Sequence, residues 1–83
     1  MRNRYYEKIK NERISRIENM NSTIEYNQNQ IKRMGADLAL EISLESFKAI
    51  SDRKAELFKE TRKMIEVREA LEKILENDIK MYE

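Results

Sequence analysis

Hydrophobic residues recur at seven-residue intervals through both halves of this sequence. A spacing of seven places side chains on one face of an α-helix, where they can pack along the length of a second helix. The pattern therefore predicts two long amphipathic helices. The two series are Ile17, Ile24, Ile31 and Leu38 in the first half, and Ile50, Leu57, Met64 and Leu71 in the second.

The composition favours helices as strongly as the spacing does. The chain of 83 residues has no proline and a single glycine, and 40% of its residues are charged while another 40% are hydrophobic. Abundant Glu, Lys, Arg, Leu and Ile at helical spacing is typical of long helices, and a chain of this length forms one domain. We therefore expect residues 1–83 to be a single all-α domain.

Gly35 is the best candidate for a turn between the two helices. Lys32 and Arg33 precede it, as suits the end of a helix, and Asp37 follows it as a possible N-cap. The sequence thus predicts an antiparallel, coiled-coil-like helical hairpin. Its first helix would span about residues 3–33, and its second and longer helix about residues 37–81.

Two other interpretations of the chain remain open. Breaks near Ser22 and Ser51 would give a three-helix bundle, because serine competes for backbone hydrogen bonds. The alternation of hydrophobic residues from Leu38 to Leu44 is typical of a strand when taken alone. We prefer a helix buried on more than one side there, since no second strand-like run exists to pair with it.

A turn at Gly35 would leave the end of the second helix without a partner in its own chain. Residues beyond about 67 would overhang, and an exposed hydrophobic stripe of that length is unfavourable in water. We therefore expect a second copy or another protein to cover it, with a homodimer preferred. The predicted interface consists of Val67, Leu71, Ile74, Leu75, Met81 and Tyr82.

Charge is unevenly distributed along the chain, although the net charge is only +1. Residues 1–34 hold eight basic residues against four acidic ones, whereas residues 35–83 hold nine against twelve. The basic segment would lie beside the acidic end of the second helix in a hairpin. An alternative function is nucleic-acid association, since basic side chains beside tyrosines can bind phosphates and stack on bases. Its candidate contacts are Arg2, Arg4, Lys8, Lys10, Arg13 and Arg16.

The residues that most enzymes need are missing. The chain has no Cys and no His, which removes the common nucleophile pairs, and one glycine cannot form a phosphate-binding loop. The glutamates at 66, 69, 72 and 76 share a helix face, but a solvated charged face explains them better than a metal site does. We expect no catalytic, metal or cofactor site, and a protein that is not an enzyme.

Asn27 is the one polar residue of interest on the hydrophobic face of the first helix, between Met20 and Met34. Such a residue can fix the alignment of two helices. We give more weight to an exposed, amide-rich turn of helix.

We expect a cytoplasmic protein with no membrane contact, since the chain has no signal-peptide core and no run of apolar residues long enough to span a bilayer. The favoured function is a protein–protein interaction module, such as an adaptor, a chaperone-like partner or an inhibitor. A structural subunit of a larger helical assembly is a third possibility.

Overall fold

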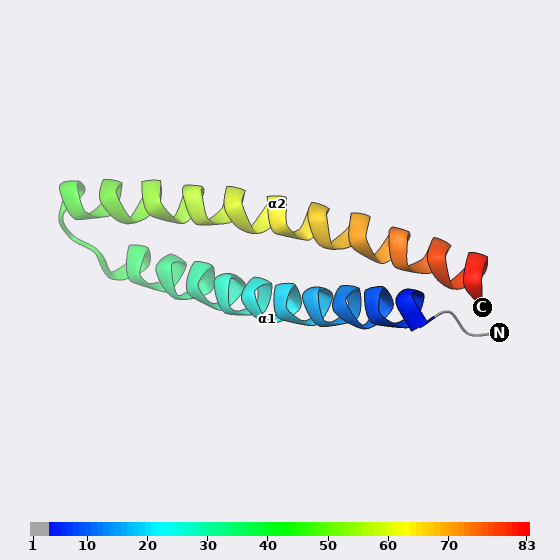
Figure 1. Ribbon diagram of the computed structural model, residues 1–83. Coiled ribbons are helices and arrows are strands. Elements are labelled where there is room, and N and C mark those ends of the chain that lie inside the picture. Colours follow the sequence, from blue (N-terminus) through cyan, green and yellow to red (C-terminus); the bar gives the residue numbers. More distant parts are fainter. Residues whose placement is uncertain (1–3) are drawn as a thin grey trace.

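The computed structural model describes residues 4–83, which form two long antiparallel helices (Figure 1). Helix α1 spans Arg4–Leu40 and helix α2 spans Leu44–Tyr82. A short connection joins them at one end of the molecule, and the other end holds the start of α1 and the end of α2. The predicted all-α helical hairpin is therefore confirmed, and no strand is present in the described part of the chain.

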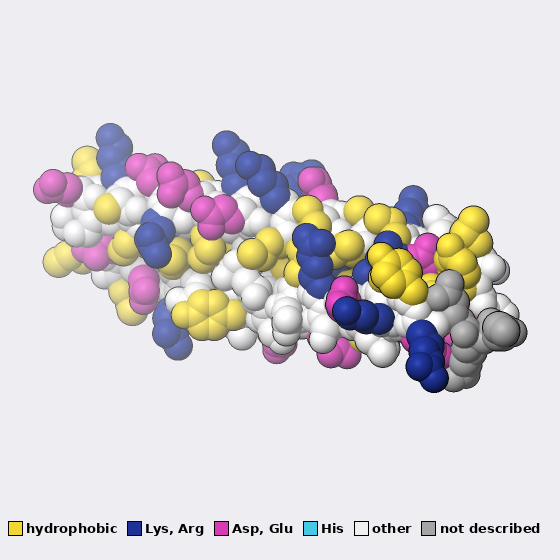
Figure 2. Space-filling model, in the orientation of Figure 1, with side chains coloured by type: hydrophobic (Ala, Val, Ile, Leu, Met, Phe, Trp, Pro, Cys, Tyr) yellow, Lys and Arg dark blue, Asp and Glu magenta, His cyan; other side chains and the backbone are white. Residues whose placement is uncertain are grey.

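The hydrophobic core is a narrow seam along the line where the helices meet. Tyr6, Ile17 and Ile24 are its buried members, and the other residues of the two predicted series are half-buried. Both series thus face the partner helix, as their seven-residue spacing predicts. The face shown in Figure 2 has hydrophobic side chains following this line, with others on the outside toward the two ends.

The turn lies at residues 41–43 and not at Gly35, so the predicted helix bounds were wrong. Gly35 lies inside α1 and has no positive φ angle. A Cβ atom placed there would be 3.5 Å from the Nζ atom of Lys54, so the side chain of Lys54 lies over this glycine. The missing side chain thus leaves room beside α2, and the helix continues through it for five more residues to Leu40.

Side-chain hydrogen bonds stabilise the connection without any glycine or proline. The backbone N–H groups of Ile42 and Ser43 both donate to Oε1 of Glu41, each at 3.1 Å. Ser43 is the N-cap of α2, and its hydroxyl accepts a hydrogen bond from the Ser46 backbone N–H at 3.4 Å. The bonds donated by the N–H groups of Ser43 and Ser46 satisfy backbone donors that the start of α2 leaves unpaired.

The three-helix alternative was also wrong. Ser22 and Ser51 both lie inside uninterrupted helices. The hydroxyl of Ser22 donates to the carbonyl oxygen of Glu18 at 3.2 Å, and Thr23 does the same to Asn19 at 3.1 Å. These hydroxyls bond to carbonyls one turn earlier, a pattern that occurs within helices, and neither residue ends α1.

Neither interpretation of residues 38–44 was correct. Leu38 and Leu40 end α1, Ile42 lies in the turn and Leu44 begins α2. The segment is therefore not a strand, and it is not helix buried on several sides either, because Ile42 is 99% exposed and Leu40 is 82% exposed.

Candidate interaction surfaces

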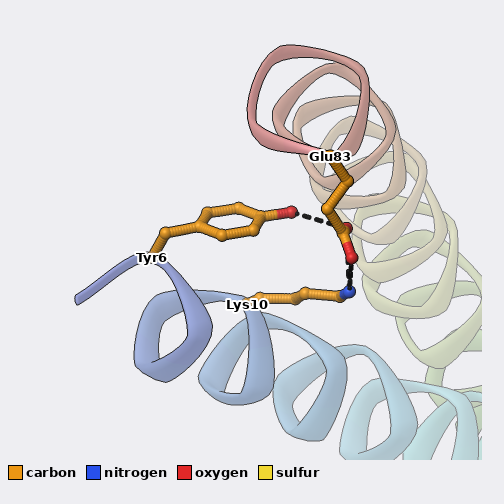
Figure 3. A network of polar contacts seen from close by, with 3 residues as sticks. All are labelled: Tyr6, Lys10 and Glu83. Carbon is orange, nitrogen blue, oxygen red and sulfur yellow. Dashed lines mark hydrogen bonds and ion pairs between the residues drawn. The ribbon is translucent and has the colours of Figure 1, made fainter. Parts of the chain in front are cut away.

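The end of α2 packs on the start of α1 and closes the open end of the hairpin. The rings of Tyr6 and Tyr82 stack with their centroids 4.7 Å apart and an angle of 28° between their planes. Figure 3 shows Tyr6 and Lys10 reaching from α1 toward Glu83, at the end of α2. The Tyr6 hydroxyl donates to Oε2 of Glu83 at 2.9 Å, and the Lys10 ammonium contacts both carboxylate oxygens at 2.9 Å.

A second ion pair, between Arg13 and Asp78, lies on the same end of the seam. With the pair of Lys10 and Glu83, it places the basic start of α1 against the acidic end of α2, as the charge distribution predicted. The predicted overhang beyond residue 67 was therefore wrong. Moving the turn from Gly35 to residues 41–43 lengthens α1 to 37 residues and shortens α2 to 39, so α2 remains the longer helix by only two residues.

The surroundings of Tyr6 shift the pKa of its phenol. Burial of the Tyr6 ring raises the pKa of its phenol above the ordinary value of 10.0, and the Glu83 carboxylate that accepts its hydrogen bond raises the pKa further. A neutral phenol is favoured because ionisation would place a second negative charge beside Glu83.

The six residues predicted as a partner interface divide into two groups. Leu71 and Leu75 are half-buried members of the seam, and Tyr82 is the stacking partner of Tyr6. The other three are exposed, to 42% at Val67, 43% at Ile74 and 76% at Met81. The hairpin thus uses Leu71, Leu75 and part of Tyr82 itself, and it leaves Val67, Ile74 and Met81 accessible.

The predicted nucleic-acid contacts do not form one free basic surface. Lys10 and Arg13 are paired with carboxylates of the α2 end, while Arg4, Lys8 and Arg16 are exposed. Arg2 lies outside the described residues. Ion pairing reduces the positive potential available to a phosphate backbone, and so this arrangement gives the nucleic-acid alternative no support.

The turn carries an exposed hydrophobic cluster that the sequence analysis missed. Around a shallow hollow of about 320 Å³, lined in part by Ile42, Leu44 and Phe47, the hydrophobic side chains are largely open to solvent. Leu44 is 76% exposed and Phe47 42% exposed, in addition to Leu40 and Ile42. We call Leu40, Ile42, Leu44 and Phe47 the tip cluster. Its sequence signal was the alternation from residue 38 onward, where the hydrophobic residues leave the helical phase.

Two polar residues are buried in the middle of the seam. Asn27 is 9% exposed and Thr61 is 3% exposed. The Asn27 amide lies 4.0 Å from the Met64 sulfur, and the Thr61 hydroxyl donates to the Leu57 carbonyl at 2.7 Å. Asn27 therefore belongs to the seam, and the preferred interpretation of an exposed turn of helix was wrong for this residue.

Two kinds of site are absent from the described residues. Between Arg4 and Glu83, no group of three or more acidic side chains is arranged to hold a metal ion. Neither helix contains a stretch apolar and long enough to cross a membrane.

The fold defines the chain as a two-helix antiparallel hairpin, and comparison adds no further assignment. No family model, no curated protein and no solved structure matches this sequence.

Proposed function

We propose that this chain is a non-enzymatic protein–protein interaction module that binds through hydrophobic surfaces on its helices. The supporting observation is the imbalance between buried and exposed hydrophobic side chains. In residues 4–83, three hydrophobic side chains are buried, whereas twelve large ones are exposed. Contiguous exposed hydrophobic patches such as the tip cluster mark interaction sites, whereas exposed hydrophobic residues scattered singly do not.

The shape of the molecule suits binding to helices or grooves better than binding to small molecules. A long two-helix hairpin presents ridges of side chains along its length, which is the geometry of helix-in-groove and bundle recognition. The charged residues between these ridges would select the partner and its orientation, because unpaired or like charges disfavour incorrect partners.

Photo-crosslinking in the cells that make the protein tests this proposal. The crosslinking residue p-benzoylphenylalanine would replace Phe47 of the tip cluster or Ile74 on the outside of α2. Tyr26 is the matched control position, because it is 64% exposed and lies apart from the tip cluster and from the outside of α2. We expect discrete protein adducts at Phe47 or Ile74 and none at Tyr26.

Either of two results would contradict the proposal. A hairpin that forms no protein adduct at either hydrophobic position, or that gives the same diffuse adducts at Tyr26, does not use these surfaces for binding.

A further inference from the structure

Helix α2 carries a second stripe outside the seam. Its members alternate at spacings of three and four residues, the same pattern that forms the seam with α1. All are exposed and none is charged. We call this stripe the outer seam, and it consists of Val67, Ala70, Ile74, Asn77 and Met81.

The other flank of α2 has no such stripe. Phe58 and Ile65 are seven residues apart there, but Arg62 lies between them and Glu69 follows Ile65 by four residues. Charged side chains at these positions would be costly to bury between two helices. The outer seam is therefore the flank of α2 that can accept a further helix.

The accessible area of the hairpin leaves room for such a contact. A compact folded chain of 10.1 kDa would expose about 5,300 Å². The hairpin exposes 7034 Å². The excess over the whole hairpin, all of its faces together, is roughly 1,700 Å², and each partner in a stable complex of standard size contributes about 800 Å².

We infer that the outer seam pairs with the outer seam of a second copy of this chain, which gives a four-helix dimer with α2 at its centre. This inference rests on the proposed interaction function and names the partner. The stripe from Val67 to Met81 extends about 21 Å along the helix, which fits a helix and not a point contact. Within residues 4–40, the strongly exposed hydrophobic residues of α1 are Tyr5, Tyr26 and Leu40, which are too widely separated to match it.

A second copy brings a surface with the same length and the same spacing. A two-fold axis would place the same patch of both chains in one interface, which is how most homodimers are built. The tip cluster would remain outside this contact, since it lies at the opposite end of α2.

Sedimentation equilibrium of charged variants tests the pairing. We expect the wild-type chain to have twice its 10.1 kDa mass at micromolar concentration. Ile74→Glu should weaken the dimer by about 30-fold or more, as expected for the centre of an interface. Phe58→Glu is the matched control on the other flank and should leave the dimer unchanged. Circular dichroism establishes that both variants remain helical.

Cysteine crosslinking tests the same contact without adding charge. Because the chain has no cysteine, any disulfide formed by a single-cysteine variant joins two copies. Under mild oxidation, we expect disulfide-linked dimers from at least one of Ala70→Cys, Ile74→Cys and Asn77→Cys, and none from the exposed control Glu25→Cys.

Several results would overturn the inference. A wild-type chain that is monomeric, or whose mass keeps growing beyond the dimer, would do so. So would a Phe58→Glu variant that weakens the dimer as much as Ile74→Glu does, or a Glu25→Cys variant that crosslinks as readily as the outer-seam variants. A monomeric chain whose Ile74 still crosslinks to a different protein would reject the second copy and retain the interaction function. A monomeric chain without any adduct would reject both.

Discussion

The ring of Tyr6 stacks on the ring of Tyr82, so that side chains from opposite ends of the sequence hold the two helices together where the hairpin is open. Tyr6 is buried in this contact, whereas Tyr82 remains 55% exposed. The relationship shows that α2 ends where α1 begins. Because Tyr6 is buried and Tyr82 remains about half-exposed, we expect the two rings to contribute differently to the free energy of unfolding.

Replacing Tyr82 by alanine tests the contribution of the stack. We expect Tyr82→Ala to lower the free energy of unfolding by about 1 kcal/mol, because stacked aromatic pairs contribute about 0.5–1.5 kcal/mol. Tyr26→Ala is the control, and its effect should stay below about 0.5 kcal/mol because that ring is exposed away from the seam. Urea unfolding at one fixed protein concentration measures both. Equal losses in the two variants would show that the stack contributes nothing.

Gly35 offers a test of where the turn lies. Because Gly35 is helical and its added Cβ would meet only ordinary contact with Lys54, we expect Gly35→Ala to raise the free energy of unfolding by about 0.5–1 kcal/mol. Thermal unfolding followed by circular dichroism would show the increase. A glycine in a left-handed turn would respond in the opposite direction, so a loss of stability would contradict the helix bounds described above.

The buried amide of Asn27 should reduce stability relative to a hydrophobic residue. Its contact with the Met64 sulfur is weak at 4.0 Å, so Asn27→Leu should raise the free energy of unfolding by about 1 kcal/mol or more. Urea unfolding measures the gain, and Asn29→Leu at an exposed neighbouring position is the matched control. A loss of stability in Asn27→Leu would show that the Asn27 amide makes a stronger hydrogen bond than its contact with the Met64 sulfur.

Stability should also depend on alkaline pH. The raised pKa of Tyr6 means that the folded chain holds a proton that the unfolded chain releases near pH 10.0. Its contribution is therefore complete below that pH and is lost as the pH rises through the folded-state pKa. Tyr6→Phe removes the titrating group, so its free energy of unfolding should fall less steeply above pH 10.0 than that of the wild type. Parallel slopes for the two chains would show that the Tyr6 phenol does not contribute to the decline.

The seven-residue spacing predicted the architecture because it reports directly on packing. Ile17 and Ile24 of the first series are buried, and Leu57 and Leu71 of the second series are half-buried, as a helical hairpin requires. Spacing of this kind specifies which face of a helix is covered, and it does so without reference to the loop. The fold class could therefore be read from the residues alone.

The position of the turn could not be read in the same way. Glycine is the usual signal for a helix end, yet Gly35 is helical, and the turn is stabilised by the side chains of Glu41 and Ser43. A glutamate carboxylate that accepts hydrogen bonds from two adjacent N–H groups has no distinctive sequence pattern. The predicted overhang followed from this one error, since the position of the turn decides which residues of the helices face each other.

Only part of the candidate surfaces could be predicted, and the reason is again the position of the turn. Val67, Ile74 and Met81 were correctly expected to be exposed, but for the wrong reason, since α2 is paired with α1 along its whole length and these residues lie beside the seam. The tip cluster was missed because Ile42 and Leu44 were assigned to a buried helix. Their exposure depends on the turn, and the turn depends on side-chain contacts that spacing does not reveal.

The short connection at residues 41–43 has a consequence for how the chain reaches this structure. Contacts next to the turn close the smallest loops and so have the lowest entropic cost, while the contact of Tyr6 with Tyr82 closes almost the whole chain. We expect the helices to associate progressively from the turn toward the termini, so that the contact between Tyr6 and Tyr82 forms last. The same order in reverse makes that pair the first contact to open when the folded molecule fluctuates.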